Sequence, residues 1–552
     1  MNHSLNPLSQ SPSLFFAMGM LPIFTLGCSV GSPGTCTSVG KCVPATPTAA
    51  AADAGIDVYP PMADEADAGS GANGDVQDAF EWSNEVDALP CTADKSPSDQ
   101  PCLVDEAFGI FVSAAGNDAA GGIKSEPTKT VTEGIARALA TGKTRVYICQ
   151  GIYGEQVVLD AKHDGVSLYG GFDCLQGWAW TGGKTQIVGP AFLSALRVDS
   201  TTKTPTIEDL AFVATDAAGQ DANGNGNSSV AALVHGASVR LRRVSLIAGN
   251  GADGTAGADG AAQPNYPTSM PTAATGLTAS TQGSAGQGAT SQCASGSSQG
   301  GAGAINQSSA GGAGTATPAP PPAAAPYDGA GGRWSATANK SAGDPGAPGG
   351  AGSGGAAATG YGTLSASGWV PSAGGDGQVG NPGQGSGGGG YVLSMGVLGN
   401  LWLSIGGEAG GCGGAEGKGG GGGGASIALA SVDAALTLTS CTLQTAAGGN
   451  GGAGGNGQDG QQGGPAAANG AGGNGAGGSG GAGGTAGISV AIAYHGVMPN
   501  YDSATQITVG QAGAAGKPGT KGLHGGPANQ PGEDGNPGAG GLRGIAASAL
   551  VF

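Results

Sequence analysis

Short apolar runs bounded by turn residues follow one another along the chain from residue 108. They occupy residues 108–113, 145–149, 156–159, 165–169, 186–188, 195–198 and 207–213. No long helical pattern separates them, which excludes a doubly wound α/β sheet. Strands this short, delivered two or three per roughly 20–25 residues, favour a solenoid in which each rung stacks on the previous one.

One segment has the period of a helix. In residues 130–140, Val131, Ile135 and Leu139 recur at helical spacing, and Thr130 or Thr132 can serve as the N-cap. We therefore expect one capping helix near the start of an otherwise all-β fold.

A second set of apolar runs repeats a common pattern later in the chain. Residues 229–235, 426–432 and 489–495 alternate in the same way, and a second short strand follows each of them. We assign residues 391–395 and 401–405 to a fourth copy, and residues 545–552 to the last strand. The pattern predicts that the solenoid continues to the C-terminus.

The first part of the solenoid resembles a known superfold. Residues 110–118, the short helix, and residues 146–155 and 165–173 are similar to the opening of right-handed parallel β-helices of the pectate-lyase-like superfold. The resemblance covers about residues 108–250. It implies a right-handed parallel β-helix with an opening strand and a capping helix, and it implies little about function.

Glycine makes up 117 of the 552 residues and is concentrated after residue 249, between the apolar runs. Such tracts form flexible linkers, collagen triple helices, or packed threefold helices of the polyglycine-II kind. Glycine recurs at every third position over much of 448–487, which favours packing there, whereas we expect 262–340 to be disordered. The collagen-like triplets of 510–525 are too few for a triple helix. Insertions in repeat proteins map to one face, so we expect the tracts to leave the solenoid on one side.

In composition, the glycine tracts are similar to those of PGRS-type surface proteins. This resemblance implies a glycine-rich protein of the cell surface.

The charge distribution separates the N-terminal region from the rest. The net charge is −18, which argues against nucleic-acid binding, and residues 43–100 carry twelve acidic residues with Lys95 as the single cation. Residues 14–27 are apolar and precede Cys28, as in a signal peptide. The ending 25–28 resembles a lipobox, which implies that Cys28 is lipidated; the alternative is ordinary cleavage, with Cys28 free to form a disulfide.

These features divide the chain into four regions. Residues 1–27 form a signal peptide, 28–104 an acidic tether rich in Ala and Pro, 105–250 the N-terminal β-helix, and 251–552 further rungs interleaved with glycine-rich insertions.

The ten cysteines of an exported chain indicate disulfides. Cys149 and Cys174 lie about one rung apart, and stacked rungs about 4.8 Å apart bring such positions within disulfide reach. Further candidates are the local pairs Cys36 with Cys42 and Cys91 with Cys102, and the more distant pair Cys412 with Cys441. Histidine is scarce and there is no CxxC pair, so we expect neither a metal site nor a cofactor.

Motifs that carry chemistry are few. Arg240, Arg242 and Arg243 form the one basic cluster, which is either a polyanion-binding surface or an ordinary solvated face. Residues 454–462 approach the calcium-binding nonapeptide, but no tandem copies follow. We assign no catalytic residue.

The expected protein is an exported, lipid-anchored bacterial surface protein with a structural or adhesive role. Its expected partners are the cell envelope, through the lipid, and a polysaccharide or another cell surface. The alternatives are a carbohydrate-active enzyme or carbohydrate-binding module on the same fold, and a self-associating extracellular matrix protein.

Overall fold

The computed structural model describes residues 91–552, apart from residues 93, 262–274, 279–284, 307, 334–341, 391, 397–398 and 467–468. All described residues belong to one compact unit, Asp87–Phe552. The expected signal peptide and the expected lipidation site Cys28 lie outside the described residues. Cys36 and Cys42, expected to pair with each other, also lie outside them, so that pairing stays a prediction.

The described residues are mostly β, with α1 (Val131–Ala140) as the one α-helix among them and 3₁₀ turns at Pro101–Leu103, Ala161–His163 and Cys174–Gln176. Three parallel sheets form what we call the three-sheet body. Sheet A contains β1 (Gly109–Val112), β2 (Arg145–Cys149), β5 (Ser167–Asp173), β9 (Thr206–Glu208), β12 (Ser238–Arg242), β23 (Ala435–Thr439) and β26 (Asn500–Tyr501), and β6 (Ala179–Trp180) pairs antiparallel with β5. Sheet B contains β3 (Ile152–Gly154), β7 (Thr185–Val188), β10 (Leu210–Val213), β13 (Ser245–Ile247), β24 (Thr442–Gln444) and β27 (Gln506–Thr508). Sheet C contains β4 (Val157–Leu159), β8 (Leu196–Asp199), β11 (Ser229–His235), β22 (Ser426–Val432), β25 (Ser489–His495) and β28 (Ala546–Val551).

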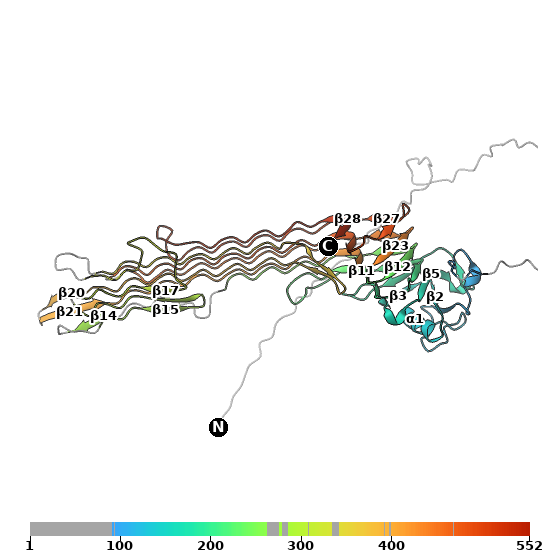
Figure 1. Cartoon of the computed structure of the whole chain (residues 1–552), viewed down its shortest axis with the longest axis horizontal. Helices are drawn as coiled ribbons and strands as arrows, with labels where there is room; N and C mark the ends of the chain where they lie inside the picture. Colours follow the sequence, from blue (N-terminus) through green and yellow to red (C-terminus); the bar gives the residue numbers. More distant parts are fainter. Residues whose placement is uncertain are drawn as a thin grey trace, which may run out of the picture. The chain divides into compact units, whose positions relative to one another are not determined.

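The chain visits the three sheets in a fixed rotation. It passes from sheet B to sheet C to sheet A in β7, β8 and β9, and repeats the order in β10, β11 and β12. β13 and then β22 to β28 continue the same rotation, so strands distant in sequence lie side by side (Figure 1). The arrangement is solenoid-like, as the repeated apolar runs predict.

Alternation along each strand builds the core of the body. In sheet B, Ile187, Phe212, Leu246 and Leu443 occupy the same register on successive strands. Each of these side chains is buried within one hydrophobic cluster shared by all three sheets. Burying a side chain of this size contributes about 1.5–3 kcal/mol, so stacking like on like stabilises each added rung.

Helix α1 covers the first rungs as expected. The Thr130 side chain accepts a hydrogen bond from the Glu133 N–H and caps the helix. Val131, Ile135 and Ala138 are buried, and α1 packs against β1, β2 and β4.

The long insertions all leave the body at one corner. Residues 214–228, 248–425, 445–488 and 509–545 each connect a sheet B strand to a sheet C strand. The corner from sheet A to sheet B is tight instead, since Asp209, Arg243 and Ser440 turn it with φ of 55°, 53° and 53°. The prediction that the insertions share one side is confirmed.

The insertions form what we call the glycine-rich array, the described residues of 248–425, 445–488 and 509–545. Its segments run side by side as threads (Figure 1). The N–H groups of Gly251, Gly254 and Gly257 each donate a 2.8 Å hydrogen bond to a carbonyl oxygen of a neighbouring thread. The three accepting carbonyl groups also lie three residues apart along their own thread. The same three-residue period joins residues 449–464 to 409–424, running antiparallel. A period of three is the one expected of packed threefold helices.

Two expectations about the insertions are wrong. β20 (Val392–Gly396) and β21 (Gly399–Ile405) are not a rung: they form an antiparallel hairpin that β14 (Thr275–Thr278) extends. Two residues separate β20 from β21, a connection length that favours an antiparallel hairpin.

Part of the stretch 262–340 is ordered, contrary to expectation. β15 (Thr290–Cys293), β16 (Gly296–Gln299) and β17 (Thr315–Thr317) form an antiparallel sheet there. A further hairpin, β18 (Gly362–Ser365) and β19 (Gly368–Pro371), lies later in the same insertion.

Candidate functional site

The basic cluster lies at the tight corner between sheets A and B, where acidic residues join it. Arg242 at the end of β12 stands in register with Glu208 at the end of β9. The next residues, Arg243 and Asp209, turn the corner in the left-handed conformation. The stacking of these two rungs therefore places an acidic pair beside a basic pair at one edge of the body.

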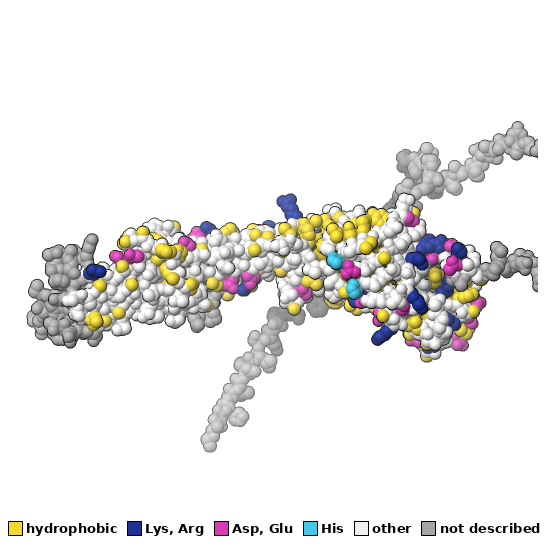
Figure 2. Space-filling view, viewed as in Figure 1, with side chains coloured by type: hydrophobic (Ala, Val, Ile, Leu, Met, Phe, Trp, Pro, Cys, Tyr) yellow, Lys and Arg dark blue, Asp and Glu magenta, His cyan; other side chains and the backbone are white. Residues whose placement is uncertain are grey.

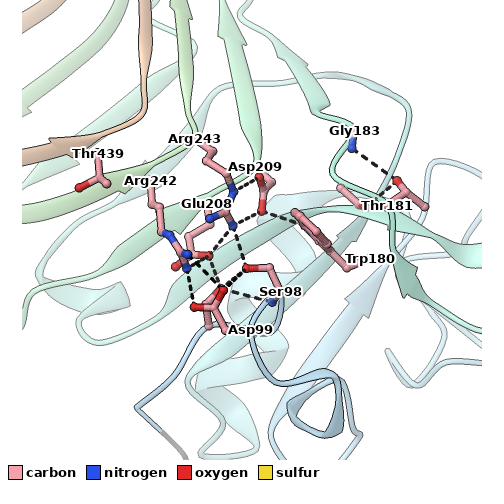
Figure 3. Close-up of polar contacts among 12 residues, drawn as sticks. Ser98, Asp99, Trp180, Thr181, Gly183, Glu208, Asp209, Arg242, Arg243 and Thr439 are labelled. Carbon is pink, nitrogen blue, oxygen red and sulfur yellow. Dashed lines mark hydrogen bonds and ion pairs between the residues drawn. The ribbon is translucent and has the colours of Figure 1, made fainter. Parts of the chain in front are cut away.

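Arg243 is held by several partners (Figure 3). Its Nε and Nη2 atoms donate to the two oxygens of Asp209, both at 2.7 Å, which is the bidentate geometry that makes guanidinium–carboxylate pairs strong. The Trp180 indole N–H also donates to Asp209 at 2.9 Å, and Arg243 reaches Glu208 at 3.1 Å.

The N-terminal segment completes this cluster. Arg242 donates to both oxygens of Asp99 at 3.0 and 3.1 Å. Ser96 Oγ donates to Glu208, and Ser98 Oγ accepts a 3.0 Å hydrogen bond from Arg243. These contacts fasten residues 96–99 to the body, so the last part of the predicted tether packs on the fold.

The electrostatics follow from burial and from these partners. Burial raises the pKa of the Glu208 carboxyl, although Ser96 and the two arginines oppose that shift. The hydrogen bond from Arg242 lowers the pKa of Asp99, and Asp209 raises the pKa of Arg243.

A groove of about 390 Å³ opens beside the cluster, between the N-terminal segment and the outer face of sheet A. Its lining includes Lys95, Tyr169, Glu208, Arg240 and Arg242.

The structure divides the three predicted polyanion-binding residues. Leu241 points inward and Arg240 is exposed, as alternation predicts. Arg242 and Arg243 are paired with Asp99, Glu208 and Asp209, so their charge is offset within the fold. Sequence reasoning missed the acidic partners, because Asp99 stands 143 residues from Arg242 and only rung register brings Glu208 opposite it.

Two of the expected disulfides are present. Cys149 and Cys174 are joined with their Cα atoms 5.7 Å apart, and Cys91 and Cys102 with theirs 6.2 Å apart. The second bridge closes the loop that carries the Ser96 to Asp99 contacts.

The suggested pairing of Cys412 with Cys441 is wrong. Cys412 lies in a thread of the array and is bonded to Cys293, whereas Cys441 lies between β23 and β24 as a buried free thiol. Cys441 Sγ is 3.5 Å from the Leu241 carbonyl oxygen inside the body. The two cysteines therefore belong to different parts of the molecule.

A second candidate site surrounds Phe192, in the loop between β7 and β8. Phe192 adopts a left-handed backbone with φ of 69°, which a bulky residue rarely does, and its side chain is 67% exposed. It borders a hollow of about 190 Å³ whose lining includes Gln156, Arg197, Asn227 and Trp369. Nothing in the sequence marks this loop, since the left-handed conformation usually signals Gly, Asn or Asp.

The polar side chains of this hollow are held in place. Gln156 Nε2 donates to the Ser194 carbonyl at 2.8 Å, and Asn227 Nδ2 donates to the Ala218 carbonyl at 2.9 Å. Arg197 donates to Asp199 at 2.7 Å, a bond that uses one of the five guanidinium N–H donors. The hollow thus combines an aromatic face with fixed polar groups, the usual composition of a small-molecule site.

Within the described residues, no group of three His, Cys, Asp or Glu side chains is arranged to hold a metal ion. In the calcium-like stretch 454–462, Asp459 instead accepts a 2.7 Å hydrogen bond from the Leu523 N–H of a neighbouring thread. The described part of the chain also contains no helix of sufficient length and hydropathy to cross a membrane.

No protein-family model matches this chain, and no curated protein or solved structure is significantly similar to it.

Proposed function

We propose that this chain is an exported bacterial surface protein, lipid-anchored through Cys28, that adheres to carbohydrate on another surface. In this proposal the three-sheet body is a right-handed parallel β-helix of the pectate-lyase-like kind. The glycine-rich array is then a polyglycine-II-like platform built on its side.

The observation that carries the adhesive role is the conformation of Phe192. Left-handed backbone in a bulky residue costs of the order of 1–3 kcal/mol and persists where the surroundings enforce it, often at functional sites. Here the strain keeps an aromatic ring in solvent at the rim of a polar hollow. A sugar ring needs such an apolar face to stack on and adjacent hydrogen-bonding groups for its hydroxyls.

The N-terminal cluster supports attachment through the chain's N-terminus. A tether ending at a lipid would pull on residues 91–104. The Cys91–Cys102 bridge closes this segment into a loop, and the bidentate contact of Arg242 with Asp99 and the bond from Arg243 to Ser98 hold the loop on the body. A pull on the tether would therefore reach the whole body.

Binding of the purified protein to insoluble and immobilised polysaccharides tests the adhesive role. Phe192→Ala is expected to lower binding at least about tenfold, because stacked aromatic residues dominate such contacts. Phe192→Tyr keeps a ring and should bind as the wild type does. The matched control is Leu175→Ala, which alters a side chain that is 98% exposed and does not line the hollow. Equal binding by all four proteins would exclude the hollow as the adhesive site.

Attachment is tested separately by metabolic labelling with a fatty acid. Label is expected in the wild type and not in Cys28→Ala. Equal labelling of both proteins would disprove the lipid anchor and leave the adhesive role standing.

A carbohydrate-active enzyme is the second candidate, favoured by the raised pKa of Glu208 beside the sheet A groove. Depolymerisation of a uronic-acid polymer by the wild type, and its loss in Glu208→Gln, would establish this function. Activity retained in Glu208→Gln would place the chemistry elsewhere.

A further inference from the structure

The body ends differently at its two ends. At the C-terminal end, β26, β27 and β28 are the outermost strands of sheets A, B and C. In the described part of the chain, no strand pairs with their outer edges. The outward N–H and C=O groups of β28 are therefore available for pairing, as at any open sheet edge.

Sheet C leaves the longest open edge at this end. Proteins protect such edges with very short strands, charged residues, proline or bulges. β26 and β27 are short, with two and three residues, whereas β28 has six and contains no charged residue and no proline. β28 reads Ala-Ala-Ser-Ala-Leu-Val, whose small side chains allow a second strand to approach closely.

Apolar side chains gather at the same end. Val497, Met498, Tyr501 and Val551 are large hydrophobic residues with exposed fractions of 38% to 65%. Ile507 and Ala549 of the last strands cover the core only in part. Figure 2 shows hydrophobic side chains concentrated over the region where Figure 1 places β27 and β28.

The opposite end cannot accept a stacked rung. Helix α1 packs against β1, β2 and β4 there, so one copy cannot continue its sheets onto the N-terminal end of another. Terminal repeats of repeat proteins are usually covered, and a partner that presents matching sheet edges would cover this one. The same end of a second copy presents such edges, and contact of like surfaces closes as a twofold dimer.

We infer that the protein forms a twofold homodimer through its C-terminal rung, in which β28 pairs antiparallel with β28 of a second copy. The dimer joins the two bodies into one continuous sheet C and buries Val551 against its counterpart's rung. This inference does not depend on the adhesive role, because the Phe192 hollow lies on the β7–β8 loop.

The mass of the purified protein in solution tests the dimer. By sedimentation, the wild type is expected at twice the mass of one chain at micromolar concentration. Val551→Lys should raise the dissociation constant at least about tenfold, because it places an unpaired ammonium in the interface. The matched control, Ile152→Lys, alters a side chain that is 67% exposed on β3 at the other end of sheet B, and should leave the dimer intact. Thermal unfolding of each variant identifies loss of folding.

A second variant tests the pairing directly. Ser548→Cys places a thiol at the middle of β28, and antiparallel pairing should give a disulfide-linked dimer on mild oxidation, beyond any formed by the unsubstituted chain. A monomeric wild type, or a dimer unaffected by Val551→Lys and not crosslinked through residue 548, would overturn the inference. So would a monomer that uses this end to bind lipid vesicles or another protein.

Discussion

In the three-sheet body the largest buried side chains, among them Tyr147, Phe172 and Phe212, are aromatic and aliphatic. In the glycine-rich array, the interior consists mostly of glycine, alanine and serine, and backbone groups of adjacent threads bond to one another. The body is thus specified by side-chain shape, whereas the array is specified by the absence of side chains.

The difference changes what each region tolerates. A core of large side chains accepts substitutions that conserve volume. In the array, a carbonyl oxygen of a neighbouring thread lies where a Cβ atom would stand. At Gly254 this oxygen belongs to Gly421, and at Gly481 it belongs to Lys418. Ordering glycine costs more backbone entropy than ordering any other residue, and the array offsets this cost with a hydrogen bond at almost every third residue.

The largest effects are expected on removal of the two long-range disulfides. Removing Cys293–Cys412 as a Ser/Ser double variant should lower the free energy of unfolding by about 5 kcal/mol. Removing Cys149–Cys174 should lower it by about 3.5 kcal/mol, because the loops closed span 119 and 25 residues and the entropy of closure grows with length. Denaturant titration of both variants measures the difference, and a larger loss for the shorter loop would contradict it.

A buried aromatic residue of the body should matter more than any single side chain of the array. Phe212→Ala is expected to destabilise the protein by about 3–5 kcal/mol through the cavity it leaves. Ala476→Gly, at an equally buried position in a thread, should cost no more than about 1 kcal/mol. Thermal unfolding monitored by circular dichroism compares the two variants. Similar losses would mean that side-chain packing stabilises both regions.

Adding a methyl group to a thread of the array should cost more than removing one. Gly481→Ala forces a Cβ into the Lys418 carbonyl and should cost about 1–3 kcal/mol. Gly540→Ala is the matched control, since nothing lies within 4 Å of its Cβ position, and it should change stability by less than about 0.5 kcal/mol. Equal effects of the two substitutions would show that the threads are not closely packed in solution.

The smallest expected effect is a pH dependence that separates the regions. His235 and Arg197 in the body lower the pKa of Asp199 to about 2. Ionised Asp199 therefore contributes stability above about pH 4, its unfolded range, and that contribution is lost as the pH falls towards 2. In the array, the His524 N–H and side chain hold the pKa of Asp534 lower still.

Melting temperatures from pH 5 down to 2 test this order. The deficit of Asp199→Asn relative to wild type should vanish near pH 2, where that of Asp534→Asn should still be measurable. Because the Asp199 side chain is 26% exposed and solvent screens its ion pairs, its deficit should stay below about 1 kcal/mol. Two deficits that vanish at the same pH would contradict the order.

Much of the body could be predicted from the sequence because its signals are local. Alternating apolar residues mark each strand, Thr130 marks the start of α1, and the distance from Cys149 to Cys174 equals about one rung. These features depend on neighbours along the chain or on the next rung.

The candidate sites and the pairing of threads depend on register between distant segments. Asp99, Glu208 and Arg242 meet only because of how three segments align. Cys293 is bonded to Cys412, 119 residues further along the chain. The glycine triplets are similar in every thread, so the sequence does not indicate which threads are neighbours. The exposed ring of Phe192 follows from its left-handed backbone conformation, which a phenylalanine in the sequence does not predict.

The three-residue period of the array has a consequence for how this molecule can change in length. Asn450 and Asn456 accept N–H groups from Ala514 and Thr520, each 64 residues further along the chain. Inserting one or two residues into a thread would move every later glycine off its carbonyl, whereas three would advance it by one turn of about 9 Å. Paired threads must then gain the same increment together. The array can therefore lengthen only in steps of one turn, which means three residues in each of the paired threads.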